Sequence, residues 1–194
     1  MPALGVDFFA RDSEVVAVEL VGHYLVFQRP ETRLVGMVVE TEAYFGSEDP
    51  ASHAYRGKTP RNTVMFGRAG ISYVYFNYGS CFLLNVVTRG IDEAGAVLIR
   101  ALEPVEGIEF MKRQRKCNSL RQLTSGPGRL TQAFGITKKE NGLDMTNGSS
   151  LRFEENPNLP NIVNVKASRR IGISKGKDSL YRFYMKDSAF VSKK

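Results

Sequence analysis

One stretch, Leu34–Tyr44, reads LVGMVVETEAY and is typical of a β-strand. A β-strand points successive side chains to opposite faces, so this pattern places Val38, Glu40, Glu42 and Tyr44 on one face. Two carboxylates and a phenol then line up at the end of the strand, where a polar loop begins. This stretch constrains the fold most, because a strand with a mixed face of this kind needs a partner that covers it.

The two glutamates of this face admit two interpretations. They could lie on a solvated strand face, which is the ordinary place for a Glu side chain. Their neighbours Val38 and Tyr44 instead indicate a face that is partly covered. A buried carboxylate is costly unless it has a partner, and burial raises its pKa toward that of a useful general base.

A second β-prone stretch, residues 71–88, reads ISYVYFNYGSCFLLNVVT. It predicts a hairpin with its turn near Gly79. Alternation puts Tyr73 and Tyr75 on the same face. Tyr78 would lie at the tip, where two outcomes are open: the ring could fold back onto the sheet, or it could wedge between base pairs in place of an extruded nucleotide.

Residues 45–70, between the two stretches, form a long segment rich in Gly, Pro, Ser and Asn. Long loops in compact domains are often functional. His53 could be either an ordinary loop residue or part of a site. No cluster of His, Cys or acidic residues at ligand spacing accompanies it, so we expect no metal site. Lys58, Arg61 and Arg68 could neutralise phosphates, although charge alone favours a solvated basic loop.

Further elements follow from caps, breakers and periodicity. Arg100 lies inside an apolar run and needs an acidic partner, for which Glu42 is a candidate. We expect three helices: one from Asp12 or Ser13 to Gly22, one starting at Glu103-Pro104, and one at Leu130–Phe134. We expect further strands at Tyr24–Gln28, Ala94–Leu102, Ser150–Phe153 and Leu180–Met185. Residues 169–173 are expected to form a short edge of structure near the site.

Composition sets the remaining limits. A chain of 194 residues with 42% hydrophobic residues fits one packed domain. The net charge of +7 favours an anionic partner such as nucleic acid. The two cysteines do not form a paired motif, so we expect neither disulfides nor structural zinc. We also expect a soluble, intracellular protein without a membrane partner, because the first residues do not have the pattern of a signal peptide and no apolar run approaches membrane-spanning length.

Several blocks together resemble one known family, the alkyladenine (3-methyladenine) DNA glycosylases. They are VETEAY, SHAYRGKTPRN, YVYFNYG, LIRALEPVEG, SGPGRL, RRIGI and LYRFY. The blocks occur in the family's order and span roughly residues 10 to 192. Each block alone is weak, whereas the ordered set is specific.

The resemblance implies an α+β fold: a single domain over residues 1–194, with a curved antiparallel sheet, surrounding helices and a hairpin that protrudes into DNA. It implies a catalytic group of three, in which Glu42 activates water and Arg100 and the backbone carbonyl of Ile171 help to hold that water. It implies stacking of the extruded base on three rings and discrimination against a guanine-type amino group by one amide. The residues that match these last roles are Tyr44, His53 and Tyr75 for stacking, Asn85 for discrimination, and Tyr78 as the wedge in the duplex.

The activity implied is base-excision repair. A damaged purine of the 3-methyladenine, 7-methylguanine, hypoxanthine or ethenoadenine class would leave duplex DNA by hydrolysis, without cofactor or strand cleavage. We expect Lys58, Arg61 and Arg68 to contact the DNA, the protein to act as a monomer, and its location to be cytoplasmic at a bacterial nucleoid, or nuclear in a eukaryote. The alternative is a non-catalytic binder of damaged nucleic acid, which would have no need of a carboxylate facing the nucleotide.

Overall fold

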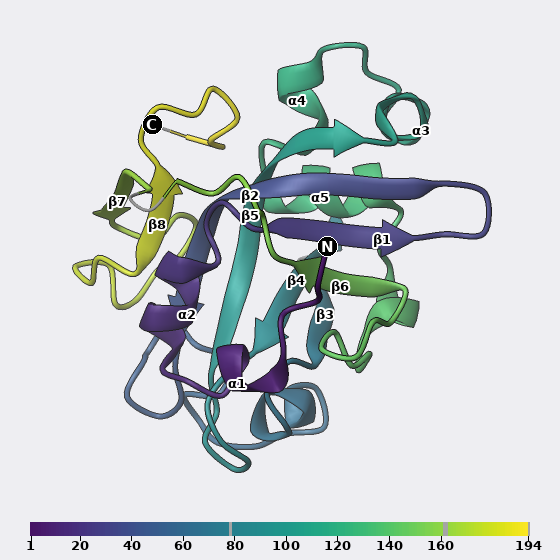
Figure 1. Cartoon of the computed structure of the whole chain (residues 1–194). Helices are drawn as coiled ribbons and strands as arrows, with labels where there is room; N and C mark the ends of the chain where they lie inside the picture. Colours follow the sequence, from purple (N-terminus) through teal and green to yellow (C-terminus); the bar gives the residue numbers. More distant parts are fainter. Residues whose placement is uncertain (78, 161–162, 194) are drawn as a thin grey trace.

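One antiparallel sheet curls through the protein and carries the site (Figure 1). The computed structural model describes residues 1–77, 79–160 and 163–193. The sheet order is β3-β4-β5-β2-β1-β6, while β8 pairs with β2 and β7 pairs with β8. The strands are β1 (Tyr24–Gln28), β2 (Arg33–Tyr44), β3 (Ser72–Asn77), β4 (Cys81–Val87), β5 (Ala96–Glu106), β6 (Leu151–Glu154), β7 (Val165–Ser168) and β8 (Arg182–Met185).

Short helices cover the sheet, and Figure 1 shows α3, α4 and α5 grouped over its upper part with α1 and α2 lower down. Helix α5 packs on β4 and β5, and α2 packs on β2. The helices are α1 (Val6–Phe9), α2 (Ser13–Glu19), α3 (Ile108–Arg115), α4 (Leu120–Thr124) and α5 (Pro127–Phe134), with 3-10 turns η1 (Thr63–Phe66) and η2 (Lys138–Glu140). Within the described ranges, none of these helices has the length and apolar character to span a bilayer. The predicted single-domain α+β fold is confirmed.

Several elements lie close to where local signals predict them. Asp12 caps α2, since its Oδ1 accepts a hydrogen bond from the Glu14 N–H at 2.9 Å. Strand β1 has the predicted bounds, and β2 begins one residue early, at Arg33. The β3–β4 hairpin pairs Asn77 with Cys81. Tyr78, which the sequence predicts at the tip, lies outside the described residues, so the predicted insertion into DNA stays a prediction.

The helix predicted to start at Glu103-Pro104 is wrong, because β5 continues through both residues to Glu106. Pro104 is opposite Gly36 of β2, beside a shift in register. The other neighbour, β4, pairs with β5 only as far as Leu98. Pro104 therefore sits where β5 has an open edge, and a proline is tolerated there because its missing N–H removes no hydrogen bond from a central ladder. The helix, α3, starts after Gly107.

Two successive irregularities interrupt the pairing of β2 with β5. Val38 is opposite Leu102 and Glu40 is opposite Ala101, so β2 carries an extra residue, whereas the next pair, Thr41 with Ile99, leaves the extra residue on β5. That second extra residue is Arg100. A β-bulge turns side chains away from the regular alternation, and this one directs the Arg100 guanidinium toward the carboxylates of β2.

Gly107 makes the turn from β5 into α3 and generates a stability prediction. Its φ is +78°, and a Cβ there would lie 2.8 Å from the backbone oxygen of Arg33 and 2.4 Å from Leu34 Cδ2. We expect Gly107→Ala to lower the free energy of unfolding by roughly 3 kcal/mol, because left-handed strain adds to a backbone clash. The matched control is Gly142→Ala, at φ +85° with nothing within 4 Å, which should cost only about 1 kcal/mol. Equal losses in chemical denaturation would contradict the steric explanation.

Candidate active site

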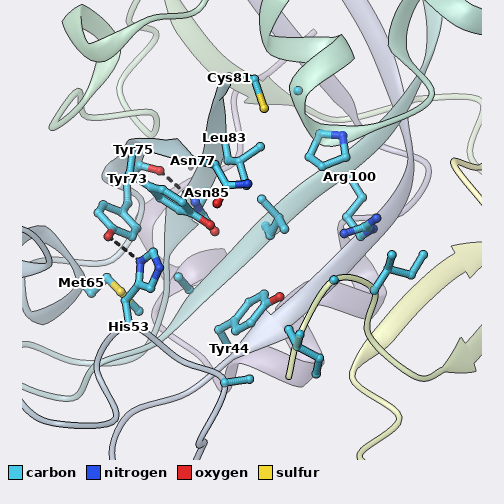
Figure 2. A pocket seen from close by; sticks show the side chains of 18 of the residues that line it. Tyr44, His53, Met65, Tyr73, Tyr75, Asn77, Cys81, Leu83, Asn85 and Arg100 are labelled. Atoms are coloured by element: carbon cyan, nitrogen blue, oxygen red, sulfur yellow. Dashed lines mark hydrogen bonds between the residues drawn. The ribbon is translucent and has the colours of Figure 1, made fainter. Parts of the chain in front are cut away.

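A cavity of about 400 Å³ opens between the loop after β2, the β3–β4 hairpin and the loop after β7. Figure 2 shows the rings of His53, Tyr73 and Tyr75 along one side of it, and Tyr44 with Arg100 along the other. This volume lies in the usual range for small-molecule pockets, so a planar ring system of nucleobase size fits. Of the predicted site residues, the cavity lining includes Tyr44, His53, Tyr75, Asn85, Arg100 and Ile171.

Glu42 is fully buried immediately behind this lining, and three lining residues hold its carboxylate. Its Oε2 accepts a hydrogen bond from the Tyr44 hydroxyl at 2.8 Å. Its Oε1 accepts a hydrogen bond from the Ile171 N–H at 2.7 Å and lies 3.2 Å from Arg100 Nη1. The predicted neighbourhood of Glu42, Arg100 and Ile171 is therefore present, although the contact that Ile171 makes with Glu42 is through its N–H. The predicted role of its carbonyl stays a prediction.

The environment of Glu42 pulls its pKa in opposite directions. Burial raises the pKa, while the Arg100 cation and the hydrogen bonds from Ile171 and Tyr44 lower it, with a net rise above the usual value for Glu. A raised pKa makes the carboxylate a stronger base, and Arg100 keeps the ionised form accessible. Such a combination is characteristic of catalytic carboxylates.

The second carboxylate on this face, Glu40, is also fully buried. Its Oε1 accepts from Arg100 Nε at 2.9 Å and from Arg182 Nε at 2.7 Å. Burial alone would raise the pKa of Glu40, but the two cations and a hydrogen bond from Ser192 hold it below its usual value. The acidic partner predicted for Arg100 is thus a pair of carboxylates, and the solvated-face interpretation of Glu40 and Glu42 is wrong.

An ion pair behind Tyr44 joins two loops of the cavity. Arg170 binds Asp49 through two hydrogen bonds of 2.6 and 2.7 Å and donates a third to the Ala43 carbonyl at 3.0 Å. Its guanidinium stacks on the Tyr44 ring, 4.6 Å from the centroid. Bidentate pairs of this kind fix geometry as well as charge. The pair therefore fixes the orientation of Tyr44 and anchors the segment that carries Ile171.

The opposite wall is a cluster of three rings. His53 packs against Tyr75 with ring centroids 4.5 Å apart, and its Nδ1 hydrogen-bonds the Tyr73 hydroxyl at 2.9 Å. His53 is packed on one side and exposed to solvent on the other. Burial of the packed side and the nearby Arg61 cation lower the pKa of His53. Burial raises the pKa of Tyr73 to about 12. At neutral pH these rings are uncharged, as a stacking surface for a planar cation requires.

Asn85 lies on β4 opposite Tyr73, and its Nδ2 donates to the Tyr73 carbonyl at 3.0 Å. This bond fixes the side chain in the cavity (Figure 2). A fixed polar side chain can exclude one substituent pattern on a bound ring while admitting another.

The three predicted DNA-contacting cations are exposed and lie on the loop between β2 and β3. Lys58 Nζ is 3.8 Å from Asp92 Oδ1, and Arg68 Nη1 is 3.0 Å from Asp144 Oδ2. Arg61 lies over the Tyr75 ring, 5.6 Å from its centroid, which places it beside the cavity. Exposed ion pairs are weak, so these contacts leave the cations available to phosphates. Their contact with DNA stays a prediction.

Several residues of the site were not predicted from the sequence: Asp49, Arg170, Arg182 and Ser192. For Arg170, the sequence indicated only that residues 169–173 lie near the site. Ile171 lines the cavity, which agrees with that expectation. Asp49 and Ser192 sit in loops with no distinguishing pattern. In the described residues, no group of three or more His, Cys, Asp or Glu side chains is arranged to hold a metal ion.

Comparisons with known proteins agree with this geometry. The family described as Methylpurine-DNA glycosylase (MPG) matches residues 7–189. A protein of Carboxydothermus hydrogenoformans named "Putative 3-methyladenine DNA glycosylase" is 50% identical over 188 residues, covering 97% of each chain. A protein of the same name from Francisella tularensis is 48% identical, and the match covers 92% of each chain. Another from Prosthecochloris aestuarii is also 48% identical, and the match covers 96% of this chain and 89% of the relative.

The match extends over nearly the whole chain and includes every segment that lines the cavity. This protein belongs to the methylpurine-DNA glycosylase family, whose members are DNA glycosylases.

Proposed function

We propose that this protein excises alkylated and deaminated purines from duplex DNA by means of a water molecule that Glu42 activates. The lesions are those of the 3-methyladenine, 7-methylguanine, hypoxanthine and ethenoadenine class. The observation that carries the proposal is a buried carboxylate of raised pKa, paired with Arg100, behind the wall of a cavity large enough for a nucleobase.

The chemistry places a negative group where positive charge develops. Cleavage of the bond between base and sugar builds charge on the deoxyribose, as in other glycoside hydrolyses. Glu42 stabilises that charge and accepts a proton from the attacking water, which Arg100 and the Ile171 carbonyl help to hold. An alkylated purine already carries positive charge and leaves without strong acid assistance.

The cavity selects the base by stacking and by shape. Tyr44 on one side and the His53–Tyr75 pair on the other hold the extruded ring, and electron-poor cationic purines stack well on such rings. Asn85, fixed by its bond to Tyr73, disfavours a guanine-type amino group. Extrusion itself favours damaged or mispaired bases, because it costs less for them.

Hydrolysis, rather than attack by an amine, is supported by the lining of the cavity. No lysine is among its lining residues in the described part of the chain. The product would then be a free base and an intact strand with an abasic site. We propose that one protein molecule performs this reaction, with Tyr78 of the hairpin filling the gap in the duplex and Lys58, Arg61 and Arg68 close to the phosphates.

The first prediction from this mechanism concerns Glu42. We expect Glu42→Gln to lower the rate of base release by roughly 100-fold or more, because the amide cannot accept the proton. Binding to lesion duplex should stay within about two-fold, since the shape is kept. The measurement uses duplex carrying a methylated adenine or hypoxanthine, with released base detected by chromatography and abasic sites by alkali-induced breaks.

The matched control for this change is Glu109→Gln, at an exposed residue of α3, which should leave the rate unchanged. Undiminished release in Glu42→Gln would remove this residue from the mechanism. Absence of base release from wild-type protein that binds lesion duplex tightly would favour the rival function, a non-catalytic binder of damaged DNA.

The second prediction is a pH profile. Glu42 acts as a base only when ionised, and its pKa is raised. The single-turnover rate on a methylated purine should therefore fall as pH decreases through a value above about 4.3, the ordinary value for Glu. The rate should change little on the alkaline side, because this lesion needs no protonation. A rate that rises steadily toward acid on the same substrate would contradict the assignment.

The third prediction concerns the hairpin tip. Tyr78→Ala should weaken binding to a lesion in duplex DNA more than binding to the same lesion in single-stranded DNA, because only the duplex leaves a gap for the ring. Fluorescence anisotropy with the two substrates measures both affinities. An equal loss on both substrates would show that Tyr78 contacts the strand without acting as a wedge.

A further inference from the structure

The C-terminal segment Ser188–Lys193 reaches the charged groups beneath the cavity. Val191 of this segment is buried and anchors it. The next residue, Ser192, donates its N–H to Glu40 Oε2 at 2.7 Å and its hydroxyl to Glu40 Oε1 at 2.9 Å. Both oxygens of a buried carboxylate are thus held by one residue that lies 152 positions away in the chain.

Glu40 in turn holds Arg100. It accepts from Arg100 Nε, which leaves Nη1 of the same guanidinium to face Glu42 at 3.2 Å. A guanidinium with only one carboxylate neighbour tends to bind it through two parallel hydrogen bonds. Here the two carboxylates share one cation, and neither forms that arrangement with Arg100.

We infer that Glu40, held by Ser192 of the C-terminal segment, is a positioning residue that divides the Arg100 guanidinium between two carboxylates and so fixes Nη1 against Glu42. The inference rests on the proposed function of Glu42. It assigns to Glu40 and Ser192 an effect on the reaction that operates through Arg100.

The hydroxyl of Ser192 shares Glu40 Oε1 with Arg100 and Arg182, and its oxygen accepts a hydrogen bond from Arg100 Nη2 at 3.5 Å. Loss of this hydroxyl removes both restraints, so Glu40 draws Arg100 toward itself and the contact of Arg100 with Glu42 lengthens. Loss of the charge on Glu40 has the opposite effect, because Arg100 is then free to turn fully to Glu42. The two changes therefore move Arg100 in opposite directions.

The pH dependence of base release detects these movements through Glu42. A looser contact with Arg100 raises the pKa of this carboxyl group, and a closer contact, or the loss of the like charge on Glu40, lowers it. The other groups that face Glu42 are Tyr44 on β2, Tyr75 on β3 and Arg170 after β7, and none of them hydrogen-bonds Glu40 or Ser192. Arg182 on β8, opposite Glu42 in the ladder, loses its ion pair in Glu40→Gln, and a turn of this cation toward Glu42 lowers the pKa of Glu42 further.

The test compares Ser192→Ala with Glu40→Gln in the full chain, by single-turnover release from the methylated-purine duplex across pH. We expect Ser192→Ala to slow release roughly 10-fold and to move the acid limb up by about half a pH unit. Glu40→Gln should move it down by a similar amount. Lesion-duplex affinity should stay within about two-fold in both variants.

The matched control is Ser188→Ala. Ser188 belongs to the same segment and is buried, but its hydroxyl accepts from the Phe190 N–H and does not contact Glu40. It should leave both the rate and the acid limb unchanged. If Ser192→Ala behaves like Ser188→Ala, or if both test variants shift the limb in the same direction, the inference is overturned.

Thermal melts identify a variant that does not fold. If Glu40→Gln fails to fold, Ser192→Ala decides alone: a shifted limb supports the inference and an unshifted limb overturns it. Glu42→Gln is measured in parallel to separate this inference from the proposed function. Full activity of Glu42→Gln refutes the role of Glu42 itself, whereas an inactive Glu42→Gln beside an unaffected Ser192→Ala refutes only the positioning.

Discussion

Two carboxylates and two guanidiniums share one buried space beneath the cavity, and the rest of the site depends on their balance. Glu40 and Glu42 have no exposed surface, and Arg100 and Arg182 have almost none. Removing one partner from such a group leaves a buried charge uncompensated and typically costs about 3–5 kcal/mol. The fold therefore tolerates these charges only as a set. Burial raises the pKa of Glu42, and Arg100 limits that rise.

This set exists because the sheet is irregular at one place. In a regular ladder between β2 and β5, the side chain of Arg100 would follow the ordinary alternation between the two faces of the sheet. The extra residue on each strand turns it toward the carboxylates. Antiparallel pairing resumes at Thr41 and Glu42, so the disturbance remains local. The departure from regular strand geometry occurs where chemistry is proposed, as is common for β-bulges.

Local patterns predicted much of this structure. Alternation placed Glu42 with Tyr44, and Tyr73 with Tyr75, because the period of a strand is independent of the rest of the chain. The start of α3 was misplaced because Pro104 suits a first helical turn as well as an open strand edge, and only the arrangement of neighbouring strands decides between them. The contacts of Asp49 with Arg170 span 121 positions, so no local pattern could predict them.

The distances along the chain also bear on how the protein becomes active during synthesis. The groups around Glu42 include Arg100, Ile171 and, through Glu40, Ser192. Domains generally acquire their packing only once the required segments have left the ribosome. A nascent chain that still lacks β8 and the residues after it carries the rings of the cavity wall but cannot complete the charge set, because β8 pairs with β2 and Ser192 binds Glu40. The pocket and the charges beneath it can therefore close only when translation is almost finished.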